Sequence, residues 1–125
     1  MKLRVLILVA AFALILGSMS MVQGAPKSGN DIVVFTANWC ANCRVIVPIV
    51  QDVAGTNGMA VRLIDVDKQD ANKQAQAYGL SIPRAELPQV YLVRGGHITL
   101  IFDASNFRYG MQDQVRSTIL GNLQP

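Results

Sequence analysis

The chain has 125 residues, a length that fits a single domain. Eleven Lys and Arg against eight Asp and Glu give a formal net charge of +3 at pH 7. No basic stripe or charge block occurs, which argues against a nucleic-acid-binding protein, so no nucleic-acid partner is expected.

The first segment has the layout of a secretory signal peptide. Lys2 and Arg4 form a basic start, Val5–Leu16 is an unbroken apolar run, and small residues follow it. A positive end, an apolar middle and a small residue at the cleavage site are typical of export signals. We therefore expect a signal peptide over residues 1–24.

The cleavage site and the fate of this segment are open. The preferred cut lies between Gly24 and Ala25, and a second candidate follows Ser20. The alternative is an uncleaved membrane anchor, because residues 5–22 form 18 positions without charge, near the lower limit for a membrane-spanning helix. Membrane contact is expected only in that case. Both alternatives predict that the remaining chain, with a net charge of +1 once the two basic residues of the signal are removed, is periplasmic or otherwise exported.

Apolar and polar runs predict the elements of the remaining chain. Residues 25–30 contain Pro, Gly, Ser and Asn and form a short linker. A buried strand over Ile32–Phe35 is followed by a helix over Cys40–Ala54, in which Pro48 should introduce a kink. The later elements are a strand over Met59–Val66, a polar surface helix over Lys68–Tyr78, a strand over Gln89–Val93, a strand over Ile98–Phe102 and a closing helix over Met111–Leu123.

The order of these elements predicts the fold class. The first two strands are joined through a helix and should be parallel, whereas the last two are joined by the tight turn Arg94–His97 and should form a hairpin. A mixed sheet covered by helices is an α/β sandwich. We therefore expect one α/β domain over residues 31–125.

Cys40 and Cys43 are the only cysteines of the chain. A stabilising disulfide usually joins distant segments, because its stabilisation grows with the loop that it closes, and this pair closes almost none. A zinc site needs four ligands, and the chain offers one histidine and no second cysteine pair, so no metal is expected. The spacing favours a reversible redox disulfide over a structural disulfide or a metal site.

The position of the pair indicates its chemistry. Cys40 falls where a strand ends and a helix begins, and the N–H groups and positive dipole end of a helix N-terminus stabilise a thiolate. We expect Cys40, as the more exposed cysteine, to be the nucleophile and Cys43 to be the resolving thiol. Arg44 is a candidate for holding the thiolate, and the alternative is a plain surface arginine.

Residues 39–44, with the sequence Trp-Cys-Ala-Asn-Cys-Arg, resemble the active-site motif of the thioredoxin superfamily. Pro48, five residues after the second cysteine, matches the helix-kinking proline of that family. Leu87-Pro88, followed by an apolar strand and then Gly95-Gly96, resembles its cis-proline strand and hairpin. The resemblance covers residues 31–123.

The resemblance implies a thioredoxin-like three-layer sandwich with a minimal mixed four-stranded sheet. It implies that the Leu87–Pro88 peptide bond is cis, that both residues hold extended substrate, and that Trp39 covers the thiols. Pro83 is a competing candidate for the cis-proline, and a partly buried packing side chain is the alternative role for Trp39. The implied activity is that of a protein disulfide oxidoreductase that needs no cofactor and exchanges a Cys40–Cys43 disulfide with disulfides or dithiols of protein substrates.

Three features depart from the family pattern. The family often has a buried acid six residues before the first cysteine, with a lysine partner, and here those positions hold Val34 and Leu63. The residues between the cysteines are Ala41 and Asn42, so the histidine of strongly oxidising relatives is missing, which favours a reductase. The loop Ser81–Glu86 is longer than in the compact family pattern, so we expect it to border the site and influence partner choice.

Two functions follow as hypotheses. The first is disulfide reduction or interchange outside the cytoplasm, with a membrane redox partner as electron donor. In the absence of the buried acid, proton transfer at Cys43 would need water or another group, for which Glu86, Asp65 and Asp67 are candidates. The alternative is a thioredoxin-fold binding or assembly module of a secretion, conjugation or cytochrome-maturation system, in which redox activity is secondary.

Overall fold

The chain forms a four-stranded sheet with helices on both faces. The computed structural model describes residues 29–84 and 86–125, so the expected signal peptide or anchor lies outside the described residues. In chain order the elements are β1 (Asp31–Thr36), α2 (Ala41–Thr56), β2 (Ala60–Asp65), α3 (Ala71–Gln76), β3 (Gln89–Arg94), β4 (His97–Asp103), the 3-10 turn η1 (Ala104–Asn106) and α4 (Gln112–Leu123).

The sheet has the strand order β2-β1-β3-β4. β1 is parallel to β2, with Asp31 opposite Ala60, and antiparallel to β3, with Asp31 opposite Val93. β3 and β4 form an antiparallel hairpin with an irregularity between Val90 and Tyr91. The parallel first pair and the closing hairpin expected from the sequence are therefore confirmed.

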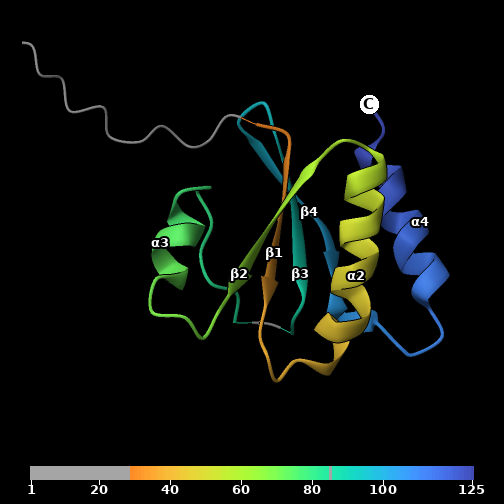
Figure 1. The fold of residues 1–125 in the computed structure, drawn as a ribbon, viewed down its shortest axis with the longest axis horizontal. Helices are drawn as coiled ribbons and strands as arrows, with labels where there is room; N and C mark the ends of the chain where they lie inside the picture. Colours follow the sequence, from red (N-terminus) through yellow and green to blue (C-terminus); the bar gives the residue numbers. More distant parts are fainter. Residues whose placement is uncertain (1–28, 85) are drawn as a thin grey trace, which may run out of the picture.

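The helices lie in two layers around this sheet (Figure 1), with α3 on one side and both α2 and α4 on the other. The side chains of β1 alternate between the two layers, as a strand requires. Ile32 and Val34 pack with the buried residues of α2 and α4, whereas Val33 and Phe35 pack with those of α3. All four are fully buried, which explains why this strand is an unbroken apolar run. The expected three-layer α/β sandwich is confirmed.

One helix is shorter than expected. The sequence predicts a helix over Lys68–Tyr78, but α3 occupies only the middle of that range. The preceding residues form turns instead, closed by the backbone N–H of Lys68 donating to the Asp65 carbonyl and that of Ala71 donating to the Lys68 carbonyl. At the other end Gly79 has φ +72°, a conformation that stops a helix and that glycine adopts readily.

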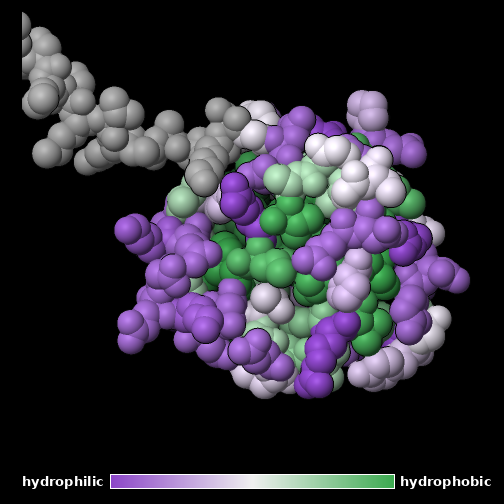
Figure 2. All heavy atoms as spheres, viewed as in Figure 1, coloured by the Kyte–Doolittle hydropathy of each residue, from purple (hydrophilic) through white to green (hydrophobic). Residues whose placement is uncertain are grey.

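One face of the domain exposes a group of apolar residues. In Figure 2, seen from the same side as Figure 1, apolar residues gather at the middle of the face and polar residues surround them. The edge strand β2 contributes to this exposure, because Leu63 on it is 41% exposed. Among the described helices, none combines the length and the apolar character that crossing a membrane would require.

Candidate functional site

The turn between β1 and α2 places Cys40 at the N-terminus of a 16-residue helix. The backbone N–H of Cys40 donates to the Ala37 carbonyl at 3.1 Å, which closes the turn. Cys40 is the N-cap residue, with extended backbone angles, and its Sγ accepts the backbone N–H of Cys43 at 3.0 Å. The first turn of the helix contains no acid. A negative sulfur at this position therefore meets free N–H groups and the positive end of the helix dipole without a competing carboxylate.

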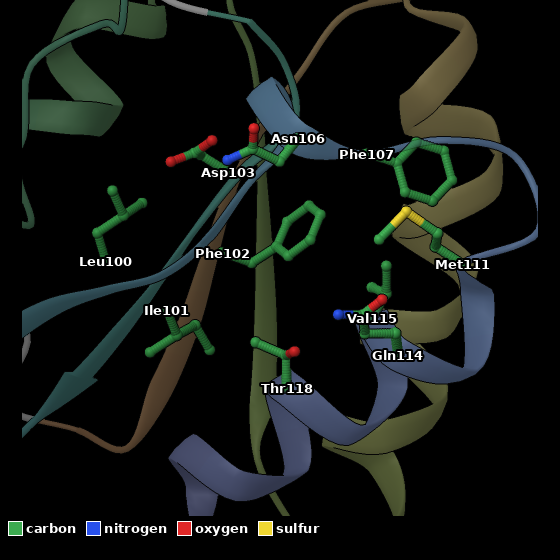
Figure 3. Close-up of a pocket in the computed structure, with 10 residues that line it drawn as sticks. All are labelled: Leu100, Ile101, Phe102, Asp103, Asn106, Phe107, Met111, Gln114, Val115 and Thr118. Atoms are coloured by element: carbon green, nitrogen blue, oxygen red, sulfur yellow. The ribbon is translucent and has the colours of Figure 1, made fainter.

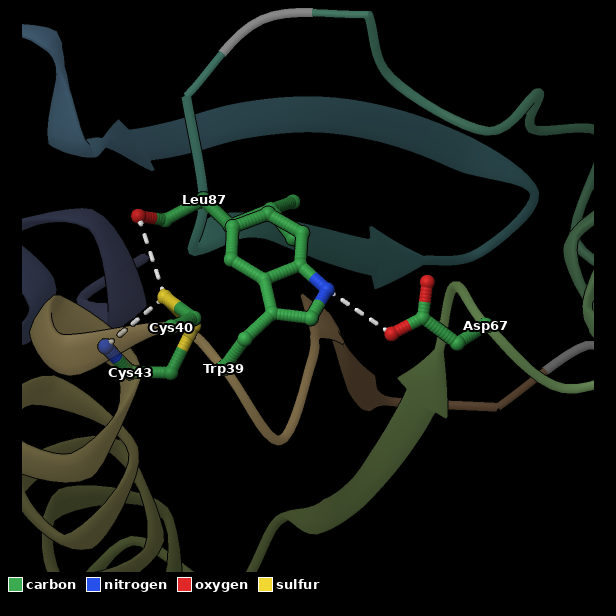
Figure 4. Close-up of a disulfide and its surroundings, with 5 residues drawn as sticks. All are labelled: Trp39, Cys40, Cys43, Asp67 and Leu87. Carbon is green, nitrogen blue, oxygen red and sulfur yellow. Dashed lines mark hydrogen bonds between the residues drawn. A yellow bond between two sulfur atoms is a disulfide. The ribbon is translucent and has the colours of Figure 1, made fainter.

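Cys40 and Cys43 are joined by a disulfide, with their Cα atoms 5.2 Å apart (Figure 4). Cys40 is the more exposed cysteine, as expected, but in this oxidised form the difference is small, because Cys40 is 5% and Cys43 is 3% exposed. The two cysteines differ more in the hollow that each one lines.

Cys40 lines a hollow of about 480 Å³ on one side of the disulfide. Trp39, Ala41, Asn42 and Leu87 line it as well, together with two charged residues of the loop before Pro88, Arg84 and Glu86. Cys43 lines a separate hollow of about 380 Å³, whose walls include Arg44 and Pro48. A substrate that reaches Cys40 therefore meets different side chains from those that surround Cys43.

Leu87 lines the Cys40 hollow, and Pro88 follows it directly in the chain. Their peptide bond is cis, whereas Pro83 does not follow a cis bond. The Leu87 carbonyl oxygen lies 3.5 Å from Cys40 Sγ (Figure 4). A disulfide sulfur carries no proton, so this is a contact in the oxidised form, and a protonated Cys40 thiol could donate to the same oxygen after reduction. Pro88 itself is fully buried and does not line the hollow.

Trp39 stands beside the Cys40 hollow. Its side chain is 66% exposed, which does not fit the alternative of a partly buried packing residue, whereas its place on the same hollow as Cys40 is compatible with the expected role at the thiols. Its indole Nε1–H donates to Asp67 Oδ2 at 2.8 Å, as Figure 4 shows. Asp67 follows β2 and was expected only as a candidate for proton transfer. It instead fixes the orientation of the indole, and Asp65 supports it by accepting the Asp67 backbone N–H at 3.0 Å.

Apolar residues occupy the two positions at which the family often has a buried acid and its lysine partner. Val34 and Leu63 are register partners on the parallel strands β1 and β2. Val34 is fully buried and belongs to the apolar cluster on the α2 and α4 side, whereas both cysteines belong to the cluster on the α3 side. The core beneath α2 is therefore apolar at the position where the family often has a carboxylate.

A further hollow lies away from the disulfide, between β4, η1 and α4 (Figure 3). It has a volume of about 320 Å³ and is lined by the core residues Ile101, Phe107 and Val115 and by the partly buried Met111. In the part of the chain that the structure describes, this hollow included, no three or more His, Cys, Asp or Glu side chains lie close enough together to hold a metal ion.

Comparisons with known proteins give matches to thioredoxins. A family model described as Thioredoxin matches residues 21–117. Thioredoxin M-type, chloroplastic, of Chlamydomonas reinhardtii is 28% identical over 65 residues, which are 52% of this chain and 44% of that protein. Thioredoxin H4 of Arabidopsis thaliana is 28% identical over 74 residues, which are 58% of this chain and 59% of that protein. The chain thus spans about half the length of the curated relatives that it matches.

Among solved structures, thioredoxin O2 from Arabidopsis thaliana in the oxidized state superposes on this chain with a TM-score of 0.45. The two sequences are 18% identical, and the superposition covers 72% of this chain and 78% of that one.

Proposed function

Because the chain belongs to the thioredoxin family, we propose that it is a thiol–disulfide oxidoreductase that exchanges its Cys40–Cys43 pair with disulfides or dithiols of protein substrates. The observation that carries the proposal is the placement of this disulfide at the N-cap of α2, open to a hollow lined by Leu87. A disulfide that closes a loop of four residues adds little stability, so its position is better explained by chemistry than by structure.

The exchange proceeds in two steps that balance in atoms and electrons. In the reduced protein, the Cys40 thiolate attacks one sulfur of the substrate disulfide; the substrate S–S bond breaks, and the leaving thiolate takes a proton from solvent. Cys43 then loses its proton and attacks Cys40 Sγ, which releases the second substrate thiolate and forms the Cys40–Cys43 disulfide. Two electrons pass to the substrate, and the reverse sequence oxidises a dithiol.

The site favours Cys40 as the attacking sulfur. The Cys43 backbone N–H and the N-terminus of α2 point at Cys40 Sγ, so they stabilise the thiolate that attacks and the thiolate that leaves in the reverse direction. The Leu87 carbonyl beside the same sulfur lies where an extended substrate backbone would approach. Asp65 and Asp67 are engaged in the turn after β2, so water in the Cys43 hollow is the simpler proton acceptor for Cys43.

The cellular side of the proposal rests on the N-terminal sequence pattern. The basic start and apolar run of residues 1–24 support export, and the residues between the cysteines support reduction or interchange over strong oxidation. A reductase outside the cytoplasm needs a source of electrons, and a membrane-bound redox partner is the class of donor that suits that place. Fractionation of cells that express the tagged full chain, with mass spectrometry of its N-terminus, tests export; an intact Met1 on a cytoplasmic protein contradicts it.

A turnover assay tests the activity. With dithiothreitol as electron donor, the wild-type protein should accelerate the reduction of insulin disulfides, and Cys40→Ser should reduce the rate to the uncatalysed background. Ser117→Ala, on the exposed face of α4 and away from the site, is the control and should keep the wild-type rate. If wild type does not exceed the uncatalysed background, the binding or assembly module is favoured; if Cys40→Ser keeps the wild-type rate, the role of Cys40 in the exchange is contradicted.

Equilibration with glutathione buffers of known potential then tests whether the protein reduces or oxidises its substrates. Reduced and oxidised forms are separated after alkylation, and the fraction oxidised is followed against the buffer potential. A potential close to that of thioredoxin supports reduction, and one close to the strong periplasmic oxidants contradicts it.

A further inference from the structure

The hollow at Cys40 carries two charged residues that the exchange steps do not use. Arg84 and Glu86 line it from the loop that precedes Leu87, and both side chains are exposed. Among the described residues the only ion pair joins Arg116 to Asp52, so Arg84 and Glu86 pair neither with each other nor with another described side chain. Two opposite charges at the rim of a reactive site are therefore available to a partner.

A substrate that enters the hollow meets these charges. Cys40 is almost completely buried, and it lines the hollow together with Arg84 and Glu86. One wall is the Trp39 indole, held by Asp67, and another is the backbone at Leu87. Neither wall carries a net charge, whereas Arg84 and Glu86 are the charged side chains among the described residues that line the hollow. These two residues are therefore the part of the hollow that can distinguish substrates by their net charge.

We propose that Arg84 and Glu86 select the substrate by charge: the preferred protein segment carries an acidic residue on the Arg84 side of its reacting cysteine and a basic residue on the Glu86 side. This proposal rests on the proposed disulfide exchange and names the class of segment that enters the site. The two residues act on substrate binding and take no part in electron transfer. Because the rim is exposed to solvent, the selection is modest and depends on salt.

The test uses two reporter peptides of the same composition, each joined through its cysteine to a fluorescent thiol leaving group. One has the order Asp-Ala-Cys-Ala-Lys and the other has Lys-Ala-Cys-Ala-Asp. Wild-type protein, reduced and at low salt, should favour one order over the other by about fivefold in kcat/KM, the scale of exposed ion pairs. The double variant R84E/E86R keeps the net charge and should favour the opposite order, and 0.5 M NaCl should remove both preferences.

A matched charge exchange elsewhere serves as the control. Asp52, near the C-terminal end of α2, and Arg116 on α4 form an exposed ion pair, so D52R/R116D also keeps the net charge, and it should keep the wild-type preference. The proposal is overturned if wild type treats the two peptides alike, or if R84E/E86R keeps the wild-type order. Hydroxyethyl disulfide, an uncharged substrate, distinguishes failure of charge selection from failure of disulfide exchange. If wild type reduces it but does not discriminate between the peptides, only charge selection fails. If wild type reduces none of the three, the proposed function fails as well.

Discussion

The contact between Trp39 and Asp67 shows how a single carboxylate shapes the site. The indole is two-thirds exposed, and its Nε1–H donates to Asp67 Oδ2 across 28 residues of sequence. An exposed aromatic side chain without such a partner would sample several rotamers. The hydrogen bond therefore provides a fixed wall for the Cys40 hollow.

Replacing this acceptor should free the indole. Asp67→Ala removes the oxygen that Trp39 donates to, so we expect lower time-resolved fluorescence anisotropy from Trp39, the single tryptophan of the chain, and a kcat/KM for insulin reduction lower by about threefold, the scale of one hydrogen bond. Asp113→Ala, in the exposed first turn of α4, is the matched control. Unchanged anisotropy in Asp67→Ala would show that the contact does not hold the ring.

Val34 gives a second test at the scale of one residue. It is fully buried among apolar side chains, so Val34→Asp should reduce the free energy of unfolding at pH 7 by about 3 kcal/mol or more, because an ionised carboxylate is costly in an apolar core. Burial raises the pKa of the introduced carboxyl above that of the unfolded chain, so the loss should shrink as the pH falls towards 4.

Urea denaturation at pH 7 and pH 4.5 measures both effects. Adding Leu63→Lys at the register partner of Val34 should recover part of the loss, since it places a cation across the β1–β2 pair. Val34→Thr, which changes shape little and introduces no charge, is the control. Equal stability of wild type and Val34→Asp at pH 7 would contradict the apolar core described for this position.

At the scale of elements, two tyrosines on the α3 side of the sheet should make the stability of the fold depend on pH in the alkaline range. Burial, followed by the nearby carboxylate of Asp31, raises the pKa of Tyr78 above 10.0. Burial, followed by Asp103, does the same for the pKa of Tyr91 on β3. A raised pKa in the folded state means that stability is full below pH 10 and is lost as the pH rises through the folded-state values, because the unfolded tyrosines ionise first.

The measurement is the unfolding free energy between pH 8 and pH 11.5. The wild-type value should fall above pH 10, and the double variant Y78F/Y91F should lose less over the same range, because it lacks the two phenols with a raised pKa. Tyr109→Phe removes a phenol from an exposed side chain and is the control. An alkaline loss in Y78F/Y91F as large as in wild type would show that other groups cause it.

The sequence predicts most elements because their patterns are local. β1 is a β-branched apolar run, and α2 places Ile46, Val50 and Val53 at helical spacing, so both elements are found close to their expected bounds. α3 is the exception. Its Ala- and Gln-rich sequence favours a helix throughout Lys68–Tyr78, but the turns that follow β2 use the first residues of that range to bring Asp67 towards Trp39. Tertiary contacts decide this boundary, and they leave no local pattern.

At the scale of the whole molecule, the same distinction separates what could be predicted about the site. Cys40 and Cys43 are marked by their spacing, and Leu87 and Pro88 by their resemblance to a family motif. Arg84 has no such mark: the sequence indicates only that its loop borders the site. Its place beside Cys40 depends on how the loop returns to the sheet between α3 and β3, which is a property of the folded chain. The nearly complete burial of Cys40 in the oxidised form also depends on packing in the folded chain.

The three layers also explain why the site lies where it does. β1 is a central strand, and its carboxyl end leads directly into α2, so the N-terminus of that helix is held at one end of the sheet. The start of β3, the neighbour of β1, runs antiparallel and brings Leu87 to the same end. Cys40 and Leu87, which are 47 residues apart, therefore meet without any other segment between them.

Trapping of the mixed disulfide tests the central claim, that Cys40 is the nucleophile and Cys43 resolves its product. Reduced Cys43→Ser protein is mixed with oxidised insulin, quenched with iodoacetamide, and analysed by non-reducing electrophoresis and peptide mass spectrometry. We predict that Cys43→Ser accumulates a covalent insulin adduct through Cys40, and that the matched Cys40→Ser protein accumulates almost none. An adduct that forms through Cys43 in Cys40→Ser at an equal or higher rate would contradict the assignment.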